Sequence, residues 1–438
     1  MKQFFCSRWR SVRLASLFHE NTVKNEDFLL SNALQFRYGS IVQKKKFDLT
    51  SDLIETYKKY TLIQPGDIMI NGLNLNYDFI TQRVALVPST GIITSAYICL
   101  RPRNSVNYRF YTYYLKALDA LKVFNGLGTG IRLTLSYDSI KNMVLPLPPR
   151  EEQDQIVRYL DWQVSKINRL IAAKRKEIAL LHEQHKRRIS EAVLHGNDDG
   201  CCQKDSGVEW IGMIPEHWSV IRCKYVFTER DERSIAGEEE HLSMSQKYGL
   251  VPDSKLDERR MLSESYVGGK VCYKNDLVLN RLKAHLGVFA LSPQKGVISP
   301  DYTVLIPNAE RILPTYGEAV LKSDLCRREL RIRVRGIIEG FWRLYTDDFN
   351  TIVIPLPPLK EQEQIMKHLS ALNNKFTALK QRLEQEINIL HELRTRLISD
   401  VVTGQVDVRS IKVPDNEYIN NEITEEEFEE ESENNEEE

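Results

Sequence analysis

The sequence repeats itself at a spacing of 209 residues, and this repeat limits what the chain can fold into more than any other feature. The segments 146–160 and 355–369 are identical at 9 of 15 positions at that spacing. The same offset aligns Trp9 with Trp218, far upstream of these segments. Agreement over such a distance does not arise by chance. The chain is therefore one module, a domain with a following segment, present twice.

The first part of each module, residues 1–146 and 205–355, predicts an α+β domain. Short apolar runs such as 67–70 are separated by turn residues, as β-strands are. Helical patterns interrupt these runs at 111–121 and at 316–333. The mixture of short strands and isolated helices therefore favours an α+β domain.

The second part of each module predicts a long helix. A pair of prolines precedes it, at 148–149 and at 357–358, and no Pro or Gly follows until Gly196 or Gly404. A helix of about 45 residues is roughly 65–70 Å long at ~1.5 Å per residue.

Both long segments carry the apolar spacing of a coiled coil. In the second copy the pattern steps by alternating four and three residues through Ile365, Leu369, Leu372, Phe376, Leu379, Leu383, Glu386, Leu390, Leu393 and Leu397. The first copy keeps such a stripe, which Lys174 and His185 interrupt. We expect the two helices to pack antiparallel on each other, which would relate the modules by an approximate twofold axis.

Composition and charge narrow the function. The chain has 438 residues, of which 42% are apolar, enough for two or three domains. Residues 415–438 contain 13 acidic side chains and no Lys or Arg, so the remaining chain has 60 basic and 48 acidic groups and a balance of +12. A positive body favours an anionic partner such as nucleic acid.

The sequence also favours a cytoplasmic protein. No apolar run approaches the ~18 residues of a membrane span, and the first residues do not resemble a signal peptide. The 7 cysteines include no C-x-x-C pair, which argues for reduced thiols and against a zinc site.

The layout resembles the specificity (S) subunit of type I restriction-modification systems. The motif Pro-Leu-Pro-Pro-x-x-Glu-Gln-x-x-Ile opens both long helices, and Gly207–Trp218 is similar to the usual start of a target recognition domain in that family. Leu279–Lys283 with Gly296–Tyr302, and Gly91–Tyr97 in the first copy, are similar to a common recognition-domain pattern. The resemblance covers roughly residues 9–405. The first domain lacks the Gly-Val-Glu-Trp start, and the acidic tail is not part of the pattern.

This resemblance implies an α+β fold class with two target recognition domains in tandem repeat, separated by two long helices that pack as an antiparallel coiled coil with pseudo-twofold symmetry. The expected boundaries are 1–146 for recognition domain 1, 147–200 for the proline-glutamine segment and long helix 1, 205–355 for recognition domain 2, 356–404 for the second such segment and helix, and 405–438 for a disordered acidic tail.

The resemblance also implies the function. Each domain would read one half of a bipartite, asymmetric site in double-stranded DNA, while the helices set the unread gap and dock two methylation subunits. Restriction subunits would join the complex. This chain would catalyse nothing and hold no cofactor, because S-adenosylmethionine, ATP and Mg²⁺ belong to the partner subunits.

The residues give little support for a catalytic function of this chain. Phe124–Gly128 fits the F-x-G-x-G pattern of S-adenosylmethionine-dependent methyltransferases, but no Asn-Pro-Pro-Tyr or Asp-Pro-Pro-Tyr motif follows to receive a flipped adenine. A turn in the recognition domain accounts for these glycines better. No metal-ligand spacing occurs among the 9 histidines.

DNA reading requires cations for phosphates and planar donors for base edges. Residues of these types gather in short loops, and the candidate DNA contacts are Lys44, Lys45, Lys46, Asn71, Asn74, Asn76, Arg132, Asn280, Arg281, Lys283, His285 and Arg343. A solvated loop explains the lysine run about equally well, and turn geometry explains the asparagines nearly as well.

Two other functions stay open at this point. The first is a coiled-coil scaffold whose domains bind protein, and the second, less favoured, is a self-sufficient methyltransferase or nuclease. A DNA reader should lose affinity steeply with salt, whereas a protein scaffold should not. The acidic tail is expected to be a solubilising end; the sharper alternative is a DNA mimic over the basic body.

Overall fold

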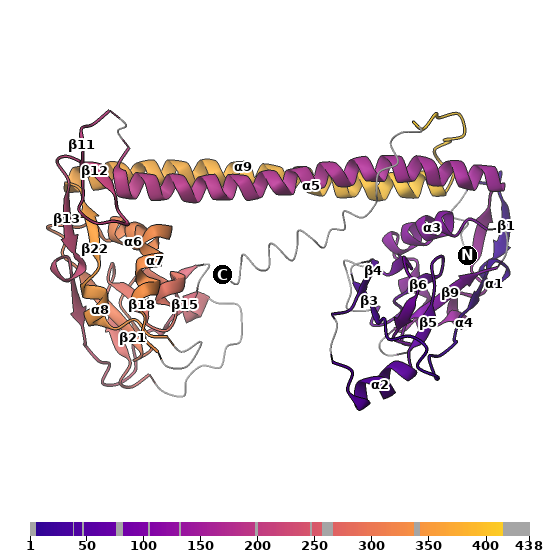
Figure 1. The fold of residues 1–438 in the computed structure, drawn as a ribbon, viewed down its shortest axis with the longest axis horizontal. Coiled ribbons are helices and arrows are strands. Elements are labelled where there is room, and N and C mark those ends of the chain that lie inside the picture. Colours follow the sequence, from indigo (N-terminus) through magenta and orange to yellow (C-terminus); the bar gives the residue numbers. More distant parts are fainter. Residues whose placement is uncertain are drawn as a thin grey trace. The chain divides into compact units, whose positions relative to one another are not determined.

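The computed structural model describes residues 6–37, 39–45, 48–75, 82–103, 106–130, 133–197, 200–245, 248–255, 266–336 and 342–414, except the side chain of His285. These residues form two compact units. Unit 1 holds the described residues up to Lys174 and those from Glu384 onward, and unit 2 holds Arg175–Leu383. We call the parts of the units outside the two long helices domain 1 and domain 2 (Figure 1).

Domain 1 consists of short antiparallel strands and a few helices. Its elements are β1 (Arg10–Arg13), α1 (Leu14–Leu17), β2 (Phe18–Glu20), β3 (Leu34–Arg37), β4 (Ser40–Gln43), α2 (Ser51–Lys58), β5 (Thr61–Ile63), β6 (Ile68–Ile70), β7 (Val84–Leu86), β8 (Gly91–Ile93), β9 (Ile98–Pro102), α3 (Tyr108–Ala120), the 3-10 turn η1 (Phe124–Leu127), α4 (Tyr137–Ile140) and β10 (Val144–Leu147).

Domain 2 repeats this order with local changes. Its elements are β11 (Gln203–Asp205), β12 (Met213–Pro215), β13 (Ser219–Arg222), η2 (Cys223–Tyr225), β14 (Phe227–Arg230), β15 (Leu242–Ser245), β16 (Gly249–Pro252), η3 (Asp253–Lys255), β17 (Lys270–Cys272), β18 (Leu277–Asn280), η4 (Ala284–Leu286), β19 (Phe289–Leu291), β20 (Gly296–Ile298), β21 (Tyr302–Pro307), α6 (Pro314–Lys322), α7 (Asp324–Arg333), α8 (Thr346–Asn350) and β22 (Val353–Leu356). The helical stretch expected at 316–333 is therefore two helices, because the Ser323 side chain caps a new one by accepting from Cys326 N–H.

The duplication is visible strand by strand. The central sheet has the order β2-β9-β6-β7 in domain 1 and β14-β21-β18-β19 in domain 2, with every pair antiparallel. The ribbons β1-β10, β3-β4 and β5-β8 recur as β13-β22, β15-β16 and β17-β20. In each sheet the same inner strand leads to an asparagine: Asn71 follows β6, and β18 ends at Asn280. This confirms two α+β domains in tandem repeat.

The two long helices have the predicted lengths and ends. Helix α5 (Arg150–His195) has 46 residues and α9 (Leu359–Val402) has 44. Each is followed by a glycine with positive φ, 84° at Gly196 and 75° at Gly404, the conformation with which glycine commonly ends a helix.

Within each unit, α5 and α9 pack antiparallel. In unit 1, Asn168 Oδ1 accepts from Arg394 Nη1 at 2.8 Å, and Lys174 pairs with Glu386. The α9 number falls as the α5 number rises, which is the mark of antiparallel helices. The same holds in unit 2, where the His182 and Phe376 ring centroids are 5.7 Å apart and His185 Nε2 is hydrogen-bonded to Asn373 Oδ1 at 2.8 Å. Lys174 and His185, which interrupt the apolar stripe, thus each contact a specific α9 side chain.

The buried stripe of α9 departs from the expected seam. Leu379 and Leu393 are 39% and 50% exposed, while Ile387 is buried. A strict alternation of four and three residues requires a steady left-handed supercoil, because a straight helix has 3.6 residues per turn. The buried face here takes additional steps of four, which moves these two leucines outward.

Each domain core is completed by the end of the helix that follows the other domain. Val401 and Val402 at the end of α9 are fully buried in the core of domain 1, and Val193 near the end of α5 is fully buried in that of domain 2. Trp9 packs against Gly404 in unit 1, as Trp218 packs against Gly196 in unit 2. Neither domain has its full core without that helix end.

The chain after α9 continues to pack on unit 1 as far as it is described. Val408 is buried in the domain 1 core, and Gln155 Nε2 donates to the carbonyls of Val408 and Ile411 at 3.0 and 2.7 Å. The tail boundary expected at 405 therefore differs from the structure over 405–414. The acidic stretch 415–438 lies outside the described residues.

The glutamine of the repeated proline motif fastens each long helix to its domain. Gln153 is buried; its Oε1 accepts from Asn107 N–H at 3.1 Å and its Nε2 donates to Pro148 C=O at 2.8 Å. Gln362, also buried, accepts from Leu313 N–H at 2.7 Å. Because Asn107 and Leu313 lie at the starts of α3 and α6, this amide joins the first turn of two helices in each unit.

We expect Gln362→Ala to lower the free energy of unfolding by about 1–3 kcal/mol, because it leaves buried backbone groups without partners. Gln153→Ala should act similarly on unit 1. Gln381→Ala, at an exposed position of α9, is the control and should change stability by less than about 0.5 kcal/mol. Chemical denaturation of the three variants measures this. Equal effects at Gln362 and Gln381 would contradict the fastening role.

All 7 cysteines are free thiols, in line with the sequence. Within the described ranges, no helix is both long enough and apolar enough to cross a membrane.

Candidate DNA interface

A polar loop follows the middle strand of each central sheet, and both loops begin with the same turn. In domain 1 the side-chain oxygen of Asn71 accepts from Leu73 N–H at 3.1 Å. In domain 2 Asn280 accepts from Leu282 N–H at 3.1 Å. An asparagine that bonds the backbone two residues on shapes a turn. These two asparagines therefore set the loop geometry, as the sequence allowed, and leave Asn74 in domain 1 and Lys283 in domain 2 exposed.

A second segment braces each loop at the same point. Leu135 N–H donates to Gly72 C=O at 2.8 Å, and Leu344 N–H donates to Arg281 C=O at 3.0 Å. Gly72 and Arg281 thus occupy one position of the repeat. A side chain at Gly72 would lie 2.6 Å from the Leu135 carbonyl oxygen, so domain 1 requires glycine there, whereas domain 2 presents an arginine.

Arg83 holds the loop of domain 1 from inside. It is 2% exposed, and its guanidinium donates to the carbonyls of Asn71, Leu73 and Asn74 at 3.0, 2.7 and 3.4 Å. Its backbone N–H donates to the buried carboxylate of Asp119 on α3 at 2.7 Å. The loop is therefore preorganised, with Asn74 exposed at its tip in a left-handed conformation, φ 51°.

Sequence reasoning missed Arg83. The one available signal is an arginine directly before the apolar run 84–87, where it is easily taken for surface charge. The equivalent residue in domain 2 is Val288, whose carbonyl accepts from Asn280 N–H as that of Arg83 does from Asn71. The equivalence of Arg83 and Val288 becomes visible only when the strand pairing of both domains is known.

The predicted contacts of domain 2 lie together. Arg281 donates to Asp301 C=O at 2.6 Å, and its guanidinium also pairs with the Asp301 carboxylate at 3.5 Å. Arg343 reaches the same carboxylate at 3.9 Å. Lys283 is exposed one turn further along the loop. Asp301 thus pairs with both Arg281 and Arg343. With Lys283, the loop keeps a net positive charge.

The other predicted contacts have mixed outcomes. Lys46, Asn76 and Arg132 lie outside the described residues, as does the side chain of His285. Lys44 and Lys45 follow β4, which packs beside β7. Lys44 donates its backbone N–H to Ala33, and Lys45 is exposed. The structure does not bring these two lysines into the loop that starts at Asn71.

The F-x-G-x-G stretch, Phe124–Gly128, packs against the loop of domain 1 that starts at Asn71. Phe124 is fully buried, and Asn125 Nδ2 donates to Leu75 C=O at 2.9 Å. A side chain at Gly128 would lie 2.6 Å from Leu75 Cδ1. These residues form a turn that packs on the loop, as the sequence favoured.

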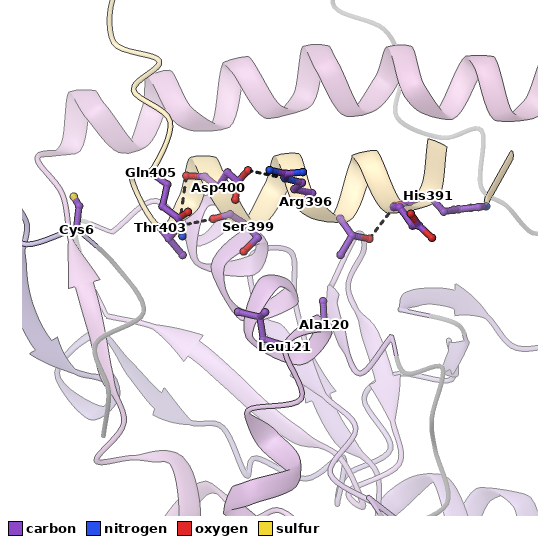
Figure 2. A pocket seen from close by; sticks show the side chains of 11 residues that line it. Cys6, Ala120, Leu121, His391, Arg396, Ser399, Asp400, Thr403 and Gln405 are labelled. Carbon is purple, nitrogen blue, oxygen red and sulfur yellow. Dashed lines mark hydrogen bonds and ion pairs between the residues drawn. The ribbon is translucent and has the colours of Figure 1, made fainter. Parts of the chain in front are cut away.

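A groove of about 910 Å³ lies beside α9 in unit 1 (Figure 2). Ala120 and Leu121 line one side, and the other is formed by α9 residues from His391 to Asp400 and by Thr403 just after the helix. The α9 side chains pair along their own helix, as Arg396 does with Asp400 at 3.5 Å. Over the described part of the chain, no three His, Cys, Asp or Glu residues are grouped to hold a metal ion.

The comparisons with known proteins agree with this geometry. The sequence model for the "Type I restriction modification DNA specificity domain" matches residues 7–180 and 231–388. The chain is 23% identical over 420 residues to the type I restriction enzyme MjaVIII specificity subunit of Methanocaldococcus jannaschii, covering 92% of this chain and 94% of that one. It is 21% identical to the EcoKI specificity subunit of Escherichia coli K12, covering 90% and 87%.

The fold is also shared with a solved structure. One chain from a study titled as the structural basis of complex assembly and conformational transition of the type I R-M system superposes with a TM-score of 0.63 at 15% identity, covering 92% of this chain and 99% of that chain. The family model matches both copies of the repeat and well over half of the sequence. The chain belongs to the family of type I restriction-modification DNA specificity subunits, which are not themselves catalytic.

Proposed function

We propose that the chain reads a bipartite, asymmetric DNA site, with each domain reading one half. The observation that carries this is the pair of equivalent loops, built alike but presenting different chemistry. Domain 1 presents the amide of Asn74, and domain 2 presents Arg281, Lys283 and Arg343. Amides suit adenine edges, and arginine or lysine suits guanine and phosphate. Two readers with unlike loops specify two unlike half-sites.

The half-sites are separable by mutation. We expect Asn74→Ala to weaken one half-site and Lys283→Ala the other, each by about 1–3 kcal/mol if the side chain makes a bidentate base contact. Binding of the complex to duplexes altered in one half at a time measures both effects. If either variant relaxed both half-sites, the assignment of one domain to one half would fail.

We also propose that the helices determine the unread gap. Insertion of one heptad in both helices, after Lys176 and after Gln385, adds ~10 Å at ~1.5 Å per residue. At ~3.4 Å per base pair that is about three base pairs. The gap in the recognised site should widen by this amount while both half-sites stay the same. An unchanged gap would mean that the length of the helices does not determine the spacing of the half-sites.

Two methylation subunits are the partners that we infer for the helices. Exposed apolar residues recur at equivalent positions of the repeat: Leu170 with Leu379, and Leu180 with Ile389. Unit 1 therefore carries Leu170 and Ile389, and unit 2 carries Leu180 and Leu379. Two like apolar patches on the outside of the helices fit two copies of one partner.

Leu170→Glu with Ile389→Glu should remove one methylation subunit from the complex and leave the other. Native mass spectrometry counts the subunits. Leu180→Glu with Leu379→Glu is the matched pair and should remove the other subunit. A complex that keeps both subunits in both variants would contradict docking at these leucines.

The remaining assignments complete the proposal. Restriction subunits join the same complex, and S-adenosylmethionine, ATP and Mg²⁺ act on the partner subunits, with no cofactor in this chain. The complex works in the cytoplasm, where its DNA is. A protein-binding scaffold is not favoured, because the family and both loops favour DNA.

A further inference from the structure

Helix α7 distinguishes domain 2 from domain 1. The stretch after α6 forms this 10-residue helix, DLCRRELRIR, whereas the described part of the stretch after α3 forms the short 3-10 turn η1, preceded by Lys122 and itself without Lys or Arg. The α7 sequence contains 4 arginines and 2 acidic residues. An added helix this basic, in one reader and not in the other, is not explained by the common fold.

Three of the four arginines of α7 lie on the side of the helix opposite its buried residues, and Arg333 does not. Cys326 and Leu330 are fully buried and anchor one side of the helix. At about 100° per residue, Arg327, Arg328 and Arg331 lie within an arc of roughly 100° on the other side. Arg328 and Arg331 are exposed. A rigid helix, capped by Ser323 and fixed by its apolar side, thus presents their guanidinium groups outward.

This surface is continuous with the recognition loop of domain 2. The position for a Gly287 side chain is 3.2 Å from Arg327 Nε, so the helix lies against the end of the loop. After α7 the chain pairs Arg335 with Arg343 through two backbone hydrogen bonds of 2.9 and 2.8 Å. The next residue, Leu344, braces Arg281. The α7 arginines therefore border the groups that we assign to base reading.

Two of the four α7 arginines form ion pairs with acidic side chains of the same helix. Arg327 pairs with Asp324 at 3.8 Å and Arg333 with Glu329 at 2.5 Å. Arg335, beyond the helix, pairs with Asp348. For Arg328 and Arg331 there is no acidic partner anywhere in the described chain. Two exposed, unpaired guanidinium groups on a rigid support are well suited to phosphate oxygens.

We propose that α7 grips the DNA backbone beside the half-site read by domain 2, with Arg328 and Arg331 each neutralising a phosphate. This rests on the proposed function, and it adds an asymmetry to it. Domain 2 carries more of the salt-dependent affinity, while domain 1 depends more on its preorganised amide loop. The two guanidinium groups hold the backbone and leave the base sequence to the loop.

The test is the salt dependence of binding. The chain in complex with its methylation subunits is titrated onto a duplex that contains its site, between about 50 and 200 mM salt. Arg328→Gln with Arg331→Gln should reduce the slope of log K against log salt by about 1.8, at ~0.9 per phosphate. Arg328→Lys with Arg331→Lys keeps both charges and should keep the slope. The recognised sequence should be the same in all three proteins.

A matched control removes two charges elsewhere in domain 2. Lys204 on β11 and Arg222 on β13 are exposed and lie where the long helices join the domain, since β12 contacts His195 and β13 pairs with β22. Lys204→Gln with Arg222→Gln should leave the slope unchanged.

The outcomes separate the two proposals. If the unmodified complex showed no preference for any sequence, the proposed function would fail. If that complex were specific and the α7 double variant kept the full slope, the backbone grip would be wrong. Loss of a methylation subunit from that variant, with the slope unchanged, would assign α7 to a protein partner and overturn the inference.

Discussion

Val402→Asp in the last turn of α9 is expected to unfold domain 1, although more than 200 residues separate Val402 from that domain in sequence. Val402 is fully buried in the core that Trp9, β2 and α3 build. A carboxylate there has no partner, and burying an unpaired charge belongs to the small class of substitutions that cost about 4 kcal/mol or more. Hydrogen exchange of the full-length chain measures the result as lost protection in β2, β6 and β9.

The repeat supplies the matched variant. Val193 occupies the position of Val402 at the spacing of 209 residues and is fully buried in the core of domain 2. Val193→Asp should therefore unfold domain 2 and leave domain 1 protected, although Val193 lies in the helix that directly follows domain 1. If each substitution instead unfolded the domain that precedes its own helix, the exchange of helix ends would be wrong.

Arg83→Met should remove the reading of one half-site. Without the guanidinium, the part-buried carbonyls of Asn71, Leu73 and Asn74 lose their shared donor, and a hydrogen bond from a charged group contributes about 1.5–3 kcal/mol. The loop then rearranges, and affinity for the site falls by roughly tenfold to a hundredfold, at ~1.4 kcal/mol per factor of ten. Mapping of methylated sites should show one half degenerate and the other intact.

Two variants show whether Arg83 acts by positioning the loop. Arg83→Lys retains a cation that can donate to the carbonyls and should restore part of the discrimination. Arg103→Met removes an exposed arginine of the same domain, which donates to Ala15 C=O at 3.2 Å, and should leave both half-sites unchanged. Degeneracy in both halves with Arg83→Met would indicate general destabilisation instead.

Much of the fold could be predicted because the same module occurs twice in the sequence. The offset of 209 residues fixed the two-domain plan, and the prolines and Gly196 or Gly404 delimited the helices to within a residue or two. Periodicity alone placed β6 correctly. It failed for Leu379 and Leu393, because the small difference between 3.5 and 3.6 residues per turn accumulates along a helix of 44 residues.

The contacts of the candidate DNA interface could be predicted less well from the sequence, for physical reasons. Loop conformation depends on long-range braces, and the brace of the domain 1 loop is Arg83, whose role follows only from which carbonyls lie around it. Likewise, Arg281 and Arg343 are far apart in sequence and meet through Asp301. The packing of Val408 against domain 1 has no local signal at all. In each case the partner is determined by tertiary structure.

The central claim is that this chain alone chooses a two-part DNA sequence for its partners. The most direct measurement is co-expression with a type I methylation subunit that forms a complex with this chain, followed by genome-wide mapping of N6-methyladenine. The account predicts one motif, made of two different specified halves at a fixed spacing, that disappears when this chain is omitted. A stable complex that methylates no such motif, or a motif that persists without this chain, would contradict it.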